Sequence, residues 1–212
     1  MKSLCLIALS LLLISIACSA QTAEQKPLYF PMKKGNDWTY HSMEYKAFSN
    51  NHPSEKIPSD ISASITYRIA DTASMGSGKY FVLRDQNDSI LRLIRFDRSK
   101  GCYYSKEHLK NGLYSPEKIF LKNRAKAGDT WMSGKIRFKV ASVAIDTTIG
   151  NTLYKKVIEV EEYIPDARLK RTIVNKHWYA EGFGEIAFYL SFPFSHSSGD
   201  RKYELSDYPG GR

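Results

Sequence analysis

Apolar and polar side chains alternate with a period of two through most of the chain. The clearest example is Ser59 to Ala70, where Ile61, Ile65, Tyr67 and Ile69 share one face and mostly polar residues share the other. This alternation predicts a strand with one buried face. Comparable patterns predict later strands at residues 79–83, 90–96, 136–142, 154–163, 171–180 and 186–192.

The number and spacing of these strands indicate the fold class. Short strands separated by turn residues, such as Gln86-Asn87-Asp88, are typical of a mainly β antiparallel sandwich or of a partly open curved barrel. No long window carries a helical stripe, so we expect only one or two short helices, within Ser105–Leu113 and Glu117–Lys126. Without an interdomain linker, residues 21–212 are predicted to form a single β-rich domain with a frayed tail at residues 207–212.

The first twenty residues follow a different pattern, which is that of a secretory signal. A positive Met1-Lys2 start precedes an almost wholly apolar run from Leu4 to Ala17. At about 14 residues this run is shorter than the roughly 20 that a membrane span needs. Cys18-Ser19-Ala20 provides a small-x-small cleavage site, and we favour processing after Ala20. The alternative is a lipoprotein signal with Cys18 as the lipidated residue, although Ser15 stands where an aliphatic residue is usual.

Cysteine usage constrains how the fold is stabilised. Cys5 and Cys18 lie in the signal segment, so only Cys102 remains and no intrachain disulfide can form. The fold must therefore rest on its apolar core, even in an oxidising compartment. Because Cys102 precedes Tyr103 and Tyr104, we predict that it is a small buried apolar residue.

A short internal repeat suggests two related β-halves. Lys34-Gly35-Asn36-Asp37-Trp38 is similar to Ala127-Gly128-Asp129-Thr130-Trp131, and each segment places Gly three residues before Trp, ahead of a predicted strand pair. Gly allows the turn, and the indole ring can then fill the end of a sheet. We interpret both tryptophans, and Trp178 as well, as core residues; the alternative is a carbohydrate platform.

These motifs resemble a family of exported bacterial proteins. Pro31 to Tyr40 is similar to the Pro-Leu-x-x-Gly-x-x-Trp-x-Tyr opening of many exported β proteins and lipoproteins, Bacteroidetes ones among them. Such proteins also carry a Gly-Asp-Thr-Trp near the middle and a late Trp-Tyr-Ala-Pro-Gly-x-Gly. Gly128–Trp131 and Trp178–Gly184 match these in order, with Glu181 in place of Pro. The resemblance implies an all-β protein of the cell envelope, and it implies no catalytic residue and no substrate.

The sequence carries no recognisable catalytic, cofactor or metal motif. Gly182 to Ala187 matches a dinucleotide-binding pattern, but a strand follows it where a helix is required, so we interpret its glycines as hairpin residues. The five histidines are not clustered, and no zinc, P-loop or nucleophile-elbow spacing occurs. Glu159 and Glu161 share one strand face, where we expect them to pair with cations such as Lys139 or Arg171. We therefore expect a protein that is not an enzyme and has no cofactor or metal.

Positive charge is concentrated in one stretch of the chain. The formal net charge is +9, and the segment Arg92–Lys126 holds ten Lys or Arg against three Asp or Glu. A local positive field favours anionic partners, which in a cell envelope are phosphorylated lipids, lipopolysaccharide or acidic glycans. The alternative is a solvated face with cations on alternate strand positions. The candidate ligand-binding residues are these cations and the tyrosines between them: Arg92, Arg95, Arg98, Tyr103, Tyr104, Tyr114, Lys122 and Arg124.

Together, these observations predict an exported, non-catalytic binding protein of the cell envelope that takes a lipid or an anionic glycan. We expect it in the periplasm or at the outer membrane, with a lipid anchor as the alternative. No nucleic-acid partner and no transmembrane segment of the mature chain are expected. The alternative function is a protein–protein component of an envelope assembly, such as a secretion or polysaccharide-export complex.

Overall fold

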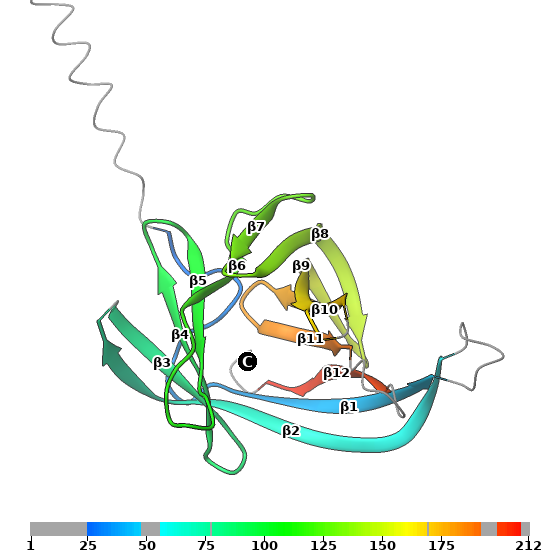
Figure 1. Cartoon of the computed structure of the whole chain (residues 1–212). Helices are drawn as coiled ribbons and strands as arrows, with labels where there is room; N and C mark the ends of the chain where they lie inside the picture. Colours follow the sequence, from blue (N-terminus) through cyan, green and yellow to red (C-terminus); the bar gives the residue numbers. More distant parts are fainter. Residues whose placement is uncertain (1–24, 48–55, 77, 169, 192–198, 209–212) are drawn as a thin grey trace, which may run out of the picture.

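The structure, a computed structural model, describes residues 25–47, 56–76, 78–168, 170–191 and 199–208. The predicted signal segment, including Cys18, lies outside these residues. The described chain forms one antiparallel sheet of twelve strands (Figure 1). They are β1 (Asp37–Ala47), β2 (Lys56–Met75), β3 (Gly78–Asp85), β4 (Ile90–Asp97), β5 (Cys102–Glu107), β6 (Lys118–Lys122), β7 (Thr130–Ser133), β8 (Ile136–Ile149), β9 (Thr152–Asp166), β10 (Arg171–Ala180), β11 (Gly184–Leu190) and β12 (Gly199–Asp207).

The strand order divides the sheet into two meanders. Along the sheet the order is β6-β5-β4-β3-β2-β1-β12-β11-β10-β9-β8-β7, so β1–β6 and β7–β12 each run consecutively and meet where β1 pairs with β12. Each meander begins at one of the two repeated segments, because Trp38 lies in β1 and Trp131 lies in β7. Gly35 and Gly128 have φ angles of 90° and 88°, which glycine adopts readily. This arrangement agrees with the two β-halves that the repeat suggests.

The sheet curls until its two end strands, β6 and β7, lie side by side (Figure 1). Two side chains of β7 reach the backbone of Ile119 in β6. The Ser133 hydroxyl accepts a hydrogen bond from the Ile119 amide at 3.0 Å, and the Trp131 indole donates to the Ile119 carbonyl at 3.0 Å. These bonds satisfy backbone groups at a sheet edge, which would otherwise need another partner. The predicted mainly β, antiparallel curved barrel is confirmed in the form of a nearly closed, barrel-shaped sheet.

The two short helices predicted from the sequence are replaced by strands and turns. The described residues contain no helix, and therefore none that is long and apolar enough to cross a membrane. In place of Ser105–Leu113, the chain completes β5 and turns through a hairpin that a His108–Tyr114 bridge closes. Glu117–Lys126 contains β6. Backbone pairing of β5 with β4 on one side and with β6 on the other decides the conformation of this polar stretch.

The start of the predicted frayed tail, Asp207, lies in a strand. β12 extends through Asp207, which lies opposite Thr39 of β1. Tyr208 then stacks on Trp38, with ring centroids 5.6 Å apart and planes inclined by 15°. This aromatic contact extends the ordered part of the fold past the end of the strand. Residues 209–212 lie outside the described residues.

The core fills the interior of the sheet and is rich in aromatic rings. Trp38 is only 1% exposed, and its indole donates a hydrogen bond to the Phe183 carbonyl at 2.6 Å. Trp131 is also buried and stacks on Phe138, with centroids 5.4 Å apart. The core placement predicted for these two tryptophans is confirmed, whereas Trp178 is half-buried.

The turn between β10 and β11 explains the glycines of the rejected dinucleotide pattern. Gly182 and Gly184 have φ angles of 81° and 95°, which residues other than glycine rarely adopt. A Cβ atom on Gly184 would also lie 3.0 Å from Trp38 Nε1. Backbone conformation and close packing therefore account for these residues, and the predicted hairpin is confirmed.

We expect Trp38→Ala to lower the free energy of unfolding by about 3–5 kcal/mol, the usual cost of deleting a large buried aromatic side chain. The variant loses the indole volume in the core and the bond to the Phe183 carbonyl. Urea unfolding measures the change. Met132→Ala, which alters an exposed side chain of β7, is the control and should stay within about 0.5 kcal/mol of wild type. Equally small effects of both substitutions would contradict this placement of Trp38.

Candidate functional site

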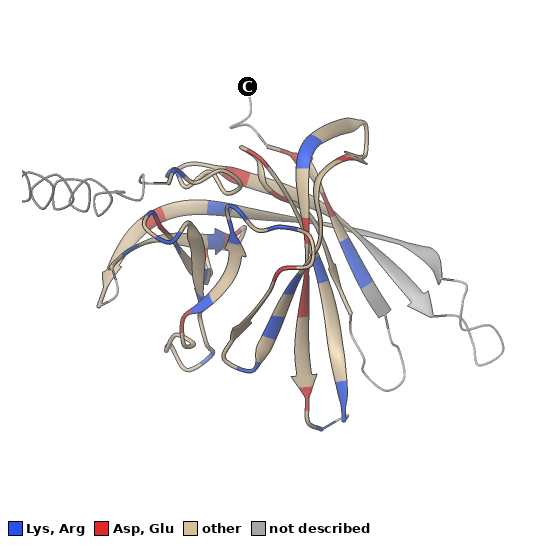
Figure 2. Ribbon diagram, turned by 90° about the horizontal axis from the view of Figure 1, so that it is seen from above, with Lys and Arg blue, Asp and Glu red and all other residues tan. Residues whose placement is uncertain are grey.

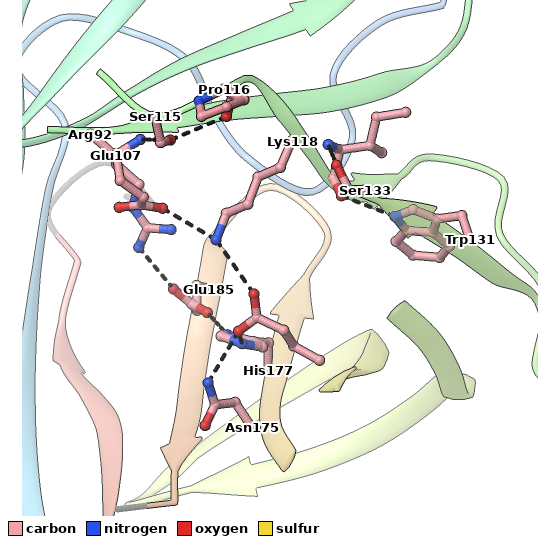
Figure 3. A network of polar contacts seen from close by, with 12 residues as sticks. Arg92, Glu107, Ser115, Pro116, Lys118, Trp131, Ser133, Asn175, His177 and Glu185 are labelled. Atoms are coloured by element: carbon pink, nitrogen blue, oxygen red, sulfur yellow. Dashed lines mark hydrogen bonds and ion pairs between the residues drawn. The ribbon is translucent and has the colours of Figure 1, made fainter. Parts of the chain in front are cut away.

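Six charged side chains that are linked by ion pairs gather inside the curved sheet, and Figure 3 shows this network from close by. Strand alternation points them inward, because each shares a strand face with core residues. Glu162, for example, follows the buried Val160 by two positions, and Arg92 precedes the buried Ile94 by two. We call the six residues the interior ion cluster: Arg92 (β4), Glu107 (β5), Lys118 (β6), Glu162 (β9), His177 (β10) and Glu185 (β11).

His177 lies at the centre of the cluster, between two carboxylates. Its Nδ1 atom is 2.6 Å from Oε1 of Glu185, and its Nε2 atom is 3.5 Å from Oε2 of Glu162. The side chains are only 16%, 5% and 8% exposed for His177, Glu185 and Glu162 respectively. Asn175, two residues before His177 on the same face, donates a hydrogen bond to Glu162 at 3.1 Å. Both ring nitrogens and both carboxylates thus have partners in a largely buried region.

The remaining members extend the cluster into the other meander. Arg92 lies 3.7 Å from Glu185, and Lys118 lies 3.4 Å from Glu162. Lys118 is also 3.3 Å from Glu107, which is the most exposed residue of the cluster. Positive and negative groups therefore alternate across the interior (Figure 3). The two contacts of Arg92 and Lys118 with carboxylates of β11 and β9 join the two meanders through side chains.

The mutual contacts shift the pKa values within the cluster. Burial lowers the pKa of His177, but hydrogen bonds to Glu162 and Glu185 and the charges of both raise it to about 9. Burial raises the pKa of Glu162, but the hydrogen bond and charge of His177, together with Lys118, lower it to about 2. Burial also lowers the pKa of Arg92, yet the charges of Glu107 and Glu185 raise it above its ordinary value. Arg92, Glu162 and His177 are therefore charged at neutral pH.

This charge state limits what chemistry the cluster can do. At neutral pH His177 carries a proton on both ring nitrogens, so it has no free lone pair with which to accept another. Glu162 is ionised and has no proton to donate. General acid–base catalysis works best with pKa values near the operating pH, and here the shifts move both values away from it. We therefore interpret the cluster as a polar framework of the interior.

The sequence does contain one signal for this cluster, which is the presence of carboxylates on otherwise apolar strand faces. Glu162 continues the apolar face of Ile158 and Val160, and Glu185 follows the hairpin glycines directly. A carboxylate on an otherwise apolar strand face needs a partner in the core. The partner, His177, could not be chosen from the sequence, because strand pairing and the bulge between Trp178 and Tyr179 bring it to Glu185.

The neighbouring carboxylates of β9 face outward, as predicted. Glu161 lies 3.7 Å from Lys139 of β8, and Glu159 lies 3.4 Å from Lys176 of β10. The expected pairing with Lys139 is confirmed, whereas Arg171 lies opposite Asp166 at the other end of the strand pair. Basic and acidic segments are interleaved on the fanned strands seen from above (Figure 2).

The structure separates the eight candidate ligand-binding residues into three places. Two of them lie inside the sheet: Arg92 belongs to the interior ion cluster, and Tyr103 is fully buried in the core. The Tyr103 hydroxyl accepts hydrogen bonds from the amides of Tyr29 and Phe30, at 2.9 Å and 3.3 Å. A ring in this position cannot stack on a ligand, so Tyr103 leaves the candidate set.

Three further candidates lie on the outer face of the first meander. The Arg95 guanidinium binds both carboxylate oxygens of Glu117 at 2.7 Å and lies 4.1 Å from the ring centroid of Tyr104. Tyr114 is half-buried and packs against a small apolar cluster that contains Tyr80. The charge of Arg95 is thus already paired within the protein. Through Tyr114 and Glu117, these contacts connect the loop between β5 and β6 to the outer face of the sheet.

The last three candidates lie where three chain segments meet at one end of the sheet. The Gln25 amide donates to the Arg98 carbonyl at 3.0 Å, and the Asn123 amide donates to the Gly101 carbonyl at 2.9 Å. The Asn123 side chain also donates to the Lys26 carbonyl at 2.6 Å. These bonds assemble six cations, which we call the basic end: Lys26, Arg98, Lys100, Lys122, Arg124 and Lys126.

All members of the basic end except Lys122 are exposed. The Lys122 ammonium lies 4.9 Å from the ring centroid of Trp131 and is half-buried. Within the part of the chain that the structure describes, two carboxylates, Asp97 and Asp129, lie in the turns of this end and accept backbone hydrogen bonds there. Asp97 accepts hydrogen bonds from the amides of Ser99 and Lys100, and Asp129 accepts one from the amide of Lys126. Among the described residues of this end, cations therefore outnumber carboxylates.

Comparison with known proteins gives distant likenesses only. No protein-family model matches the sequence, and no curated protein matches it. A candidate lipoprotein from Parabacteroides distasonis has a TM-score of 0.42 and 10% identity, covering 87% of this chain and 100% of that chain. A candidate exported protein with a YmcC-like fold from Bacteroides fragilis has a TM-score of 0.44 and 11% identity, covering 86% and 99%. The terms lipoprotein and exported protein refer to those two proteins and not to this chain.

The interior ion cluster makes stability depend on pH with a defined sign. The pKa of His177 is 6.5 in the unfolded chain and about 9 in the fold, so its stabilising effect is complete below pH 6.5 and is lost as the pH rises through 9. The pKa of Glu162 falls from 4.5 to about 2, so its effect is complete above pH 4.5 and is lost as the pH falls towards 2. His177 and Glu162 together therefore stabilise the fold most between about pH 4.5 and pH 6.5.

We expect His177→Gln to flatten the decline in unfolding free energy between about pH 6.5 and 9, because the Gln amide does not titrate. Urea unfolding of both proteins at a series of pH values measures the slope. The control is His41→Gln, which changes an exposed ring of β1 and should keep the wild-type slope. Parallel pH curves for wild type and His177→Gln would show that His177 is not held as a buried cation.

Proposed function

We propose that this chain is an exported, non-catalytic binding protein of the cell envelope, and that its basic end binds an anionic lipid or glycan. The supporting observation is that three separate segments meet there and bring six cations together. Three of the eight residues singled out by sequence, Arg98, Lys122 and Arg124, belong to this set. An excess of exposed positive charge attracts anions and accelerates their association.

The state of the other charged groups supports the choice of this end. The interior ion cluster holds three cations against three carboxylates, so its charges are compensated within the protein. Arg95 is likewise compensated by Glu117. By contrast, the carboxylates of the basic end are engaged with backbone amides and are fewer than the cations. A ligand anion can therefore gain most at the basic end.

A second candidate function is a protein–protein component of an envelope assembly. The observation that favours it is exposed apolar surface at the tip of the β5–β6 hairpin, where Leu113 is 62% exposed and Leu109 is exposed beside it. Exposed apolar side chains that lie together are common at protein contacts. This surface is at the opposite end of β5 from the basic end, so substitutions can test the two functions separately.

The variant that tests the proposed function reverses Arg98, Lys100, Arg124 and Lys126 to Glu. Arg95 and Lys122 are left unchanged, because Arg95 pairs with Glu117 and Lys122 packs over Trp131. With polygalacturonate and a short-chain phosphatidylglycerol as probes at low salt, we expect affinity to fall roughly 100-fold or more, since each cation near an anionic surface contributes about 1 kcal/mol. Isothermal titration measures binding.

The matched control replaces Lys110, Lys135, Arg168 and Lys170 with Glu; these residues are exposed and lie in turns at the other end of the strands. It changes the net charge by the same amount, so we expect at most a small loss of affinity. Equal losses in the two variants would indicate a response to total charge, and unchanged binding by the first variant would rule out the basic end as the site.

A further inference from the structure

We propose that the basic end docks the protein onto an anionic membrane surface, with Leu28 as its apolar contact. The inference rests on the proposed function and deepens it, since it commits the same site to a lipid bilayer. Three features carry it: the exposure of the charged turns, the position of Leu28, and the place at which the N-terminal segment joins the fold.

The first feature is the shape of the charged region. Its cations lie in turns and in the N-terminal segment, at the end of the sheet. None of the described aromatic rings close to them in sequence is exposed: Tyr103, Tyr104, Phe120 and Trp131 are buried, and Tyr29 and Phe96 are half-buried. A protein site for a glycan chain ordinarily offers exposed rings that stack on sugars, whereas a bilayer surface requires only exposed cations and apolar side chains. The chemistry of this end therefore favours the bilayer.

The second feature is an exposed leucine among the cations. Leu28 is 40% exposed although its backbone is fixed. Its amide lies 3.3 Å from Oδ1 of Asn123, and its carbonyl accepts a hydrogen bond from the Gly182 amide at 2.7 Å. An apolar side chain held at a basic surface can enter the acyl boundary while the cations contact phosphate groups.

The third feature is that the N-terminal segment enters the fold at this end. The Gln25 amide donates to the Arg98 carbonyl, and the Gln25 side chain lies over Gly101, where an added Cβ atom would clash with Oε1 of Gln25. Cys18 is seven residues earlier in the chain. An extended segment of that length reaches at most about 25 Å. In the alternative processing, with Cys18 lipidated, the lipid would keep the basic end towards the membrane, and a lipid chain with a polybasic patch gives more stable anchoring than either alone.

The test uses the processed chain, residues 21–212, with Cys102→Ser, so that one new cysteine carries an environment-sensitive fluorophore. Ser99→Cys places it in the β4–β5 turn, and Asn111→Cys places it at the tip of the β5–β6 hairpin. Vesicles contain phosphatidylcholine with or without phosphatidylglycerol. We expect a blue shift for the Ser99 label with anionic vesicles only, its loss at high salt, and no shift for the Asn111 label.

Two substitutions add quantitative expectations. The four reversals at Arg98, Lys100, Arg124 and Lys126 should abolish the shift of the Ser99 label. Leu28→Ser should weaken vesicle binding roughly fivefold to tenfold, because it removes one apolar side chain from the contact. The same substitution should leave polygalacturonate binding unchanged, since that probe has no acyl region.

The outcomes separate this inference from the proposed function. Binding of polygalacturonate without binding of anionic vesicles would overturn membrane docking and leave the proposed function in place. Failure to bind either would overturn both. A response of the Asn111 label in place of the Ser99 label, an equal response of both, or equal binding to neutral vesicles would also overturn docking through the basic end.

Discussion

The structure depends on the mutual compensation of charges inside a sheet that has curled onto itself. Six ionisable side chains point into the interior, and a buried charge without a partner is costly. Part of this compensation crosses between the two meanders, because Arg92 and Lys118 of the first contact Glu185 and Glu162 of the second. The other contacts lie within one meander, between Glu107 and Lys118 and between His177 and its two carboxylates. The curvature of the sheet brings Arg92 and Lys118 within reach of their partners in the second meander, and the contacts of β7 with Ile119 complete the closure.

This division of charge shapes the functional interpretation. Inside the sheet, cations and carboxylates are matched, and the shifted pKa values of His177 and Glu162 fix their charge states at neutral pH. At the end where the N-terminal segment joins the fold, the cations exceed the carboxylates and lie in exposed turns. We interpret the interior ion cluster as a polar framework, and the proposed binding function lies with the exposed charge at one end.

Much of the fold could be predicted from the sequence, because its determinants are local. Period-two alternation located most strands, and Gly35 and Gly128 marked the turns that precede the core tryptophans. The expected helices failed because polar stretches carry little periodic signal, and pairing of β5 and β6 decided their conformation. The convergence of Arg92, Glu185 and His177 could not be predicted, since it depends on strand order and on a bulge in β10. Tyr103 and Tyr104 point to opposite faces of β5 because side chains alternate along a strand. The choice of both tyrosines as ligand-binding candidates considered only their position between cations in the sequence and ignored this alternation.

A double-mutant cycle on Lys118 and Glu162 tests most directly whether the interior charges join the two meanders. Lys118→Met, Glu162→Gln and the double variant would be compared with wild type by urea unfolding at neutral pH. The two side chains lie 3.4 Å apart, are largely buried and belong to β6 and β9. The account predicts a coupling free energy of about 1–3 kcal/mol, as for groups of one buried network. Additive effects, within about 0.3 kcal/mol, would contradict it, because independent sites add in this way.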